Sequence, residues 1–180
     1  MSAPRRDEIR ELATAVGDGL SAYVAIHDTV FQDASTLKSV LKNLFGRGVP
    51  MSKLLQDAEA LLPFWHSMRD RMQAFRQRSY AAMSRDEQHY FDLLSRYVDA
   101  LSATVVALVD RQRLLNDGSK GGTDNPMTWQ AFQDKERAYQ VAVKQYKVIG
   151  GELNNAAPII FGDRSSTERT VHAAGLHGIC

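Results

Sequence analysis

The fold of this chain is decided by residues 54–79, LLQDAEALLPFWHSMRDRMQAFRQRS, and by residues 91–115, FDLLSRYVDALSATVVALVDRQRLL. In both stretches apolar side chains recur at alternating steps of three and four residues, the heptad spacing that packs long helices side by side. We call the apolar positions the seam: Leu54, Leu61, Trp65, Met68, Met72, Phe75, Phe91, Leu94, Val98, Leu101, Val105 and Leu108, with Ala58, Ser79 and Leu115 in phase. The seam predicts helix packing or a dimer contact, and argues against a compact enzyme built around a pocket.

The composition is that of an ordinary soluble domain, with 44% apolar and 24% charged residues in a chain of 180. A net charge of +1 creates no overall field for nucleic acid, so we expect no nucleic-acid partner. The single cysteine, Cys180, cannot form an internal disulfide, which suits a reducing compartment. The first residues lack the apolar core of a signal peptide, and no apolar run approaches the roughly 20 residues of a membrane span. We therefore expect a soluble, cytoplasmic protein.

Helical periodicity extends over most of the chain, and no strand-like alternation persists. We predict helices over residues 7–31, 36–45, 52–83, 84–116 and 127–149. Residues 117–126 are rich in glycine and polar side chains and predict a flexible loop. Residues 163–180 predict an irregular tail. The fold class is therefore all-α, and residues 1–180 form one domain, an elongated antiparallel helical bundle or coiled coil.

Glycine, proline and one capping motif mark the expected bends and ends. Gly17 and Gly19 make a bend plausible in the first helix. The heptad phase continues through Pro63, which favours a kink over a stop. Ser84 and Glu87 have the spacing of a capping box, in which each side chain binds a backbone N–H of the other residue. The pair Gly150–Gly151 is expected to end the helix that begins near residue 127.

Motifs for catalysis or metal binding are scarce. The segment Gly118-Ser-Lys-Gly-Gly lacks the residue order of a phosphate-binding loop. Asp86 and His89 have the spacing of half a carboxylate-bridged metal site, but no second pair accompanies them. His27 and His66 fall near apolar faces, where a partly buried, hydrogen-bonded histidine is expected. We therefore predict no enzymatic activity, no metal and no cofactor.

Basic residues form two groups. One group flanks the seam of residues 54–79, where charged heads meet acidic partners: Arg69, Arg71, Arg76 and Arg78. The other predicts contacts with anionic lipid: Arg111, Arg113, Lys120, Arg137, Lys144 and Lys147. Of these, Arg137, Lys144 and Lys147 share one arc of the expected helix 127–149. A solvated charged surface is the simpler explanation of the second group, and both interpretations stay open.

The stretch Asp86-Glu-Gln-His-Tyr90-Phe-Asp-Leu-Leu-Ser-Arg-Tyr97 resembles the second long helix of the BAR domain of sorting nexins, in their endosomal-recycling and autophagy branch. An acidic pair, a tyrosine, a leucine and another tyrosine recur in that helix at this spacing. The similarity continues through residues 105–115 and 129–147. Ile160-Phe161-Gly162, with Glu168 and Arg169, resembles the tip that joins the second and third helices of the family.

This resemblance implies a dimer of long helices, formed with itself or with a related BAR-type protein, that binds curved, anionic membrane. It implies a peripheral location on endosomal membranes, a role in protein transport and autophagy, and no enzymatic activity. The apolar residues Ile159, Ile160 and Phe161 would be a membrane tip, or else a small anchor folded back on the bundle. The chain departs from the family in lacking the phosphoinositide-binding PX domain and most of the third helix. A fragment, an isoform and a diverged protein all fit that departure.

A second functional class also fits the seam. A helical scaffold or adaptor would leave the seam exposed and bind a partner helix along it. The membrane module and the adaptor differ in which surface carries the function: basic side chains in the first, and apolar seam residues in the second.

Overall fold

The computed structural model describes residues 3–32, 51–119 and 128–162, and every regular element in them is helical. The elements are α1 (Ala3–Gln32), α3 (Met51–Glu59), α4 (Leu62–Ser79), a short 3₁₀ helix η1 (Tyr80–Ala82), α5 (Arg85–Ser119) and α6 (Trp129–Phe161). No strand occurs in this part of the chain, so the predicted all-α class is confirmed. The expected helix 36–45 and the expected tail 163–180 lie outside the described residues.

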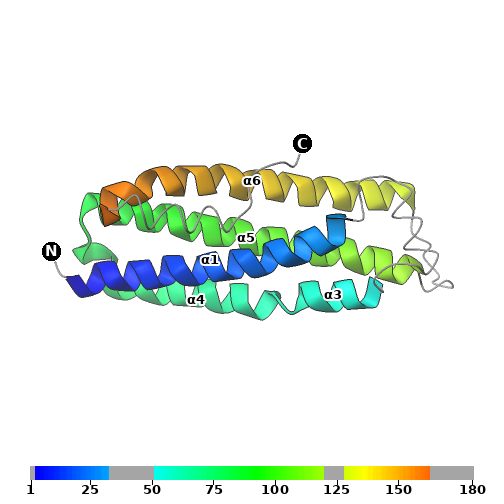
Figure 1. Cartoon of the computed structure of the whole chain (residues 1–180), viewed down its shortest axis with the longest axis horizontal. Helices are drawn as coiled ribbons and strands as arrows, with labels where there is room; N and C mark the ends of the chain where they lie inside the picture. The colour runs from blue at the N-terminus through cyan, green and yellow to red at the C-terminus, as the bar shows by residue number, and fades with distance from the viewer. Residues whose placement is uncertain (1–2, 33–50, 120–127, 163–180) are drawn as a thin grey trace.

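The helices lie side by side along the longest axis of the molecule (Figure 1). In that view α1 and α5 run in one direction, while α3–α4 and α6 run in the other. Successive arms of the bundle are therefore antiparallel, as in an up-down helical bundle. Helix α5 packs against α1, α3, α4 and α6, and its longest contact is with α6.

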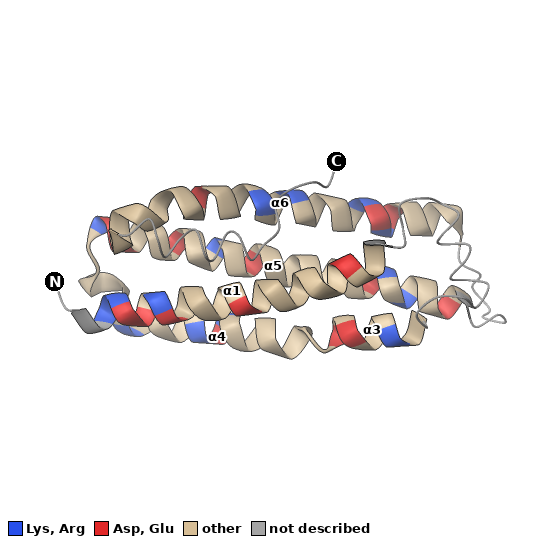
Figure 2. Cartoon of the chain, viewed as in Figure 1, with Lys and Arg blue, Asp and Glu red and all other residues tan. Residues whose placement is uncertain are grey.

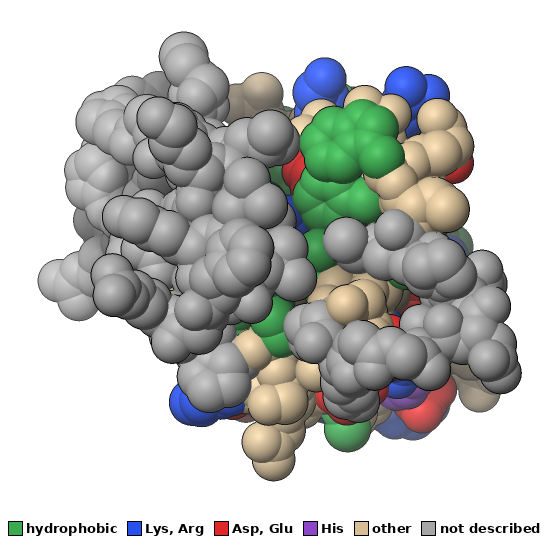
Figure 3. Space-filling model, turned by 90° about the vertical axis from the view of Figure 1, so that its right-hand side faces the viewer, with side chains coloured by type: hydrophobic (Ala, Val, Ile, Leu, Met, Phe, Trp, Pro, Cys, Tyr) green, Lys and Arg blue, Asp and Glu red, His purple; other side chains and the backbone are tan. Residues whose placement is uncertain are grey.

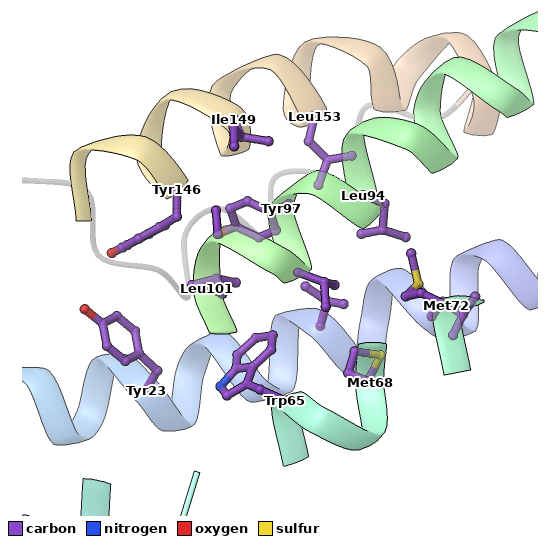
Figure 4. Packing of buried hydrophobic residues seen from close by; sticks show 14 of the residues in the cluster. Tyr23, Trp65, Met68, Met72, Leu94, Tyr97, Leu101, Tyr146, Ile149 and Leu153 are labelled. Carbon is purple, nitrogen blue, oxygen red and sulfur yellow. The ribbon is translucent and has the colours of Figure 1, made fainter. Parts of the chain in front are cut away.

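The core is built from the seam. All twelve of its residues are buried, and Trp65, Phe91, Leu94, Leu101, Val105 and Leu108 have no measurable exposure. Figure 4 shows Leu94 and Leu101 of α5 lying between Ile149 and Leu153 of α6 on one side and Trp65, Met68 and Met72 of α4 on the other. The two stretches that the heptad spacing singled out are thus covered within a single chain.

Helix packing continues across a break at Ala60–Leu61, which separates α3 from α4. Pro63 lies in the first turn of α4, where its missing N–H leaves no intrahelical hydrogen bond unmade. The sequence favoured a kink, and the structure shows two helices. Burial of Leu61 and Trp65 on either side shows that the heptad phase continues through the break.

The capping box at the start of α5 is present as predicted. The Ser84 N–H donates to Glu87 Oε2 at 2.8 Å, and the Glu87 N–H donates to Ser84 Oγ at 3.3 Å. Burial raises the pKa of the Glu87 carboxyl, but the hydrogen bonds from Ser84 and the charges of Arg6 and Arg5 outweigh it, so the net pKa is lowered. The Arg6 Nε lies 3.5 Å from Glu87 Oε1, which connects the start of α1 to the start of α5.

Two predicted helix ends, that of α5 and that of α6, are wrong. Helix α5 continues through Ser119, and α6 continues through Gly150–Gly151 to Phe161. A Cβ atom at Gly150 would lie 3.0 Å from the Tyr97 ring, so this glycine serves close packing against α5 rather than helix termination. Helix α6 ends instead at Gly162, whose φ of 65° is the left-handed conformation that favours glycine.

Helix α1 is continuous from Ala3 to Gln32, and Gly19 has a packing role within it. A Cβ atom there would collide with the ring of Phe64, which is half-buried and packs edge-on against Trp65 at 5.1 Å between centroids. The glycine therefore lets α1 approach α4 closely. Helix propensity alone does not reveal this role.

We predict opposite effects for alanine at two helical glycines. Gly19→Ala lowers the free energy of unfolding by about 1–3 kcal/mol, because the Phe64 ring has to move. Gly151→Ala raises it by about 0.5–1 kcal/mol, because nothing lies within 4 Å of the new methyl group and alanine favours the helix. Urea denaturation followed by circular dichroism measures both values. Equal effects from the two substitutions would contradict the close approach of α1 to α4.

Candidate functional site

The six cations predicted to contact lipid differ in their surroundings. Arg111 is 4% exposed, and its Nε donates to Glu136 Oε2 at 2.5 Å. Its guanidinium also lies over the rings of Phe31 and Phe132, at 4.8 and 5.5 Å from their centroids. The structure therefore places Arg111 between α1, α5 and α6, where it connects helices and is turned away from solvent.

Arg113 is exposed but paired. Its Nε and Nη2 both donate to Glu59 Oε1, at 3.0 and 2.7 Å, which joins α5 to α3. Lys120 lies outside the described residues. The remaining three cations, Arg137, Lys144 and Lys147, are exposed on α6 and form no ion pair with any residue that the structure describes.

Exposed apolar side chains lie close to these three cations. Within the described ranges, five large hydrophobic residues are exposed, and four of them belong to α6: Trp129, Val141, Val148 and Ile159, at 57, 59, 63 and 64%. At about 100° per residue these four and the three cations fall within one arc of about 120°, opposite the buried side of α6. We call the set the α6 outer face: Trp129, Arg137, Val141, Lys144, Lys147, Val148 and Ile159.

The α6 outer face carries no acidic residue. The three acidic residues of α6 lie outside the arc: Glu136 accepts from Arg111, Glu152 lies 3.5 Å from Arg96, and Asp134 accepts from Gln130. Figure 2 shows Lys and Arg along the middle of α6. The end of the bundle where α6 begins shows exposed hydrophobic side chains with Lys and Arg close by (Figure 3). The face is therefore positive and partly apolar over about 45 Å of helix.

The expected membrane tip is divided between the core and the surface. Ile160 is 2% exposed and belongs to the core. Phe161 packs edge-on against Tyr90 at 5.2 Å between centroids, and the Arg10 guanidinium lies over its ring. Only Ile159 points into solvent, where it extends the α6 outer face. Ile160 and Phe161 thus lie as expected for a small apolar anchor that folds back on the bundle.

Three of the four arginines that flank the first seam stretch meet acidic partners within the chain. Arg69 pairs with Asp99 at 2.9 Å, and Arg76 pairs with Asp92 at 2.7 Å. Arg78 pairs with Glu8 at 2.6 Å, so these residues hold α4 to α5 and to α1.

A buried tyrosine cluster connects α1 to α6, and the sequence did not reveal it. The hydroxyls of Tyr23 and Tyr139 lie 2.6 Å apart, and the Tyr146 ring meets that of Tyr23 at 5.8 Å. Figure 4 shows the hydroxyls of Tyr23 and Tyr146 turned toward each other. Burial raises the pKa of all three hydroxyls, so they stay protonated and can donate. Their only sequence signal was tyrosine on an otherwise apolar helix side.

Gln112 was also missed, although it follows the heptad steps from Leu108 to Leu115. It is 1% exposed, and neither Nε2 nor Oε1 of its side chain has a hydrogen-bond partner in the structure. A polar residue at a single seam position lowers stability while fixing helix register. His27, by contrast, lies as expected: it is half-buried, and Nδ1 lies 3.2 Å from an Asp28 carboxylate oxygen.

The described residues contain no group of three or more His, Cys, Asp or Glu side chains arranged to hold a metal ion. Among the described helices, none combines the length and hydropathy that crossing a bilayer requires. Comparison of the chain with protein-family models found no match. Searches of curated proteins and of solved structures likewise found no match. The resemblance of residues 86–97 to sorting nexins therefore stays a prediction.

We predict that Gln112→Met raises the free energy of unfolding by about 1–2 kcal/mol, because it removes unpaired polar atoms from the core at nearly constant volume. Chemical denaturation measures the change. Gln133→Met, on the exposed side of α6, is the matched control and should stay within about 0.5 kcal/mol of the parent protein. A loss of stability in Gln112→Met would mean that the amide is satisfied in solution.

Proposed function

We propose that this protein is a non-enzymatic helical module that associates with anionic membrane through the α6 outer face. One observation carries the proposal: four of the five large hydrophobic side chains exposed in the described residues share a helix face with three unpaired cations and no acid. Exposed apolar patches mark interaction sites. Basic and apolar side chains combined on one helix face suit the boundary between lipid headgroups and acyl chains.

The expected affinity is modest. Each cation near a charged bilayer contributes about 1 kcal/mol, so Arg137, Lys144 and Lys147 together supply about 3 kcal/mol. Trp129 adds an aromatic ring of the kind enriched at membrane interfaces, and partial insertion of the exposed valines adds apolar burial. Binding should therefore be reversible and should weaken with salt, because the charges are exposed and screened.

Among the described residues, the proposal narrows the lipid site predicted from the sequence. Arg111 and Arg113 are occupied by Glu136 and Glu59, so the described lipid contacts are the three cations of α6. Seam residues such as Leu101 and Val105 are buried within one chain, so a dimer formed through the seam would require the bundle to open. An adaptor that binds a partner helix along the seam would require the same opening. If the sorting-nexin resemblance holds, the membrane is endosomal.

The test is co-sedimentation with liposomes that contain or lack anionic lipid, at low and high salt. We expect Lys144→Glu with Lys147→Glu to reduce binding by roughly 30-fold or more, since the loss of two cations alone removes about 2 kcal/mol. Val141→Ser with Val148→Ser should reduce binding without changing its salt dependence.

The matched control is Arg71→Glu with Arg85→Glu, which makes the same change in net charge at exposed positions of α4 and α5. This control should bind liposomes almost as the parent protein does. Equal losses in both charge-reversal variants would show a response to net charge rather than to a face. Undiminished binding after reversal at Lys144 and Lys147 would exclude the α6 outer face.

A further inference from the structure

The exposed Trp129 ring of the α6 outer face is connected to the interior by two further rings and one guanidinium. The rings of Trp129 and Phe132 lie 5.6 Å apart between centroids, with 31° between their planes. The Arg111 guanidinium lies 5.5 Å from the Phe132 centroid and 4.8 Å from that of Phe31. These four residues, Trp129, Phe132, Arg111 and Phe31, form a continuous series of contacts that we call the Arg111 stack. It leads from solvent at the start of α6 to the end of α1.

The inner end of the Arg111 stack is fixed in the core. The Phe31 ring is stacked on that of Tyr139 at 5.5 Å between centroids, with 5° between their planes. The Tyr139 hydroxyl in turn lies 2.6 Å from that of Tyr23. Because Tyr139 and Tyr23 are buried, the stack has a closely packed support at this end.

Arg111 is itself held in one orientation. Its Nε donates to Glu136 Oε2 at 2.5 Å, and Glu136 Oε1 accepts from the Gln140 amide at 3.0 Å. A planar guanidinium can pair with a carboxylate while its face stacks on an aromatic ring. A lysine ammonium keeps the charge but lacks this plane. Arginine is therefore suited to join Phe31 of α1 to Phe132 of α6.

Trp129 gains from such support because it occupies the first turn of α6. The first N–H groups of a helix have no intrahelical acceptors, and helix ends fray. The Thr128 side chain accepts from the Ala131 N–H at 3.1 Å, but this cap holds the backbone and not the indole ring. A ring that is already ordered loses less conformational freedom when it enters a partner, which strengthens binding.

From this geometry we infer that Arg111 is a positioning residue of the α6 outer face: it holds the Phe132 ring, against which Trp129 is ordered for contact with anionic membrane. The inference rests on the proposed function and concerns how that same site is held. Arg111 is only 4% exposed, so it acts through Phe132 and Trp129. The sequence predicted a direct lipid contact for Arg111, and the stack gives it an indirect role.

A double-mutant cycle tests the inference by liposome binding. Arg111→Lys preserves the charge and removes the planar group from the stack. We expect it to weaken binding to anionic liposomes by about three- to tenfold. Trp129→Ala should weaken binding at least as much. When the two substitutions are combined, Arg111→Lys should cause no further loss, because the ring that it positions is already absent.

The mobility of the indole ring provides a second readout, which needs no membrane. Trp65 has no measurable exposure, so acrylamide quenches mainly Trp129, and Trp129→Ala supplies the fluorescence of Trp65 alone. In Arg111→Lys we expect a lower fluorescence anisotropy of Trp129 and stronger quenching by acrylamide. Circular dichroism establishes that each variant is folded at the temperature of the measurement.

The matched control is Arg76→Lys, the same change at an arginine of α4 that also stacks on two rings and pairs with an aspartate. It should leave both readouts at the values of the parent protein. An equal loss from Arg111→Lys with and without Trp129 would overturn the inference alone, as would an unchanged anisotropy of Trp129. A parent protein that binds no anionic liposomes would overturn the proposed function, and this inference with it.

Discussion

Burial of α5 is the constraint on which the rest of the structure depends. Its seam residues Leu94, Leu101 and Leu108 have no measurable exposure, and each large apolar side chain buried in this way contributes about 1.5–3 kcal/mol. Because α5 packs against every other helix arm, the positions of α1, α3–α4 and α6 are all set by it. The ion pairs Arg76–Asp92 and Arg113–Glu59 add surface contacts from α5 to α4 and to α3.

The sequence predicted the inward side of α4 and α5 well because heptad spacing is local and repeats many times. A single irregular residue such as Pro63 interrupts the backbone without moving the apolar side. Helix ends were harder to predict. Gly150 and Gly151 resemble a terminator locally, but the contact between Gly150 and Tyr97 involves residues more than fifty positions apart, and that tertiary contact overrides the local preference.

The distance in sequence between contacting residues also explains which site residues were predicted and which were not. Arg111 appears in the sequence as a surface cation, and its partner Glu136 lies 25 residues away on another helix. Lys144 and Lys147 were placed correctly on an exposed arc because helical periodicity alone decides that. Gln112 shows a related limit: periodicity places it in the core, and nothing local indicates that its amide lacks a partner.

Once the seam is covered within one chain, the apolar surface that remains exposed no longer serves folding. Among the described residues, most of the large exposed hydrophobic side chains lie on the α6 outer face. The three unpaired cations on the same face favour an anionic surface. Because these cations are exposed and screened by salt, attachment through this face alone would be reversible.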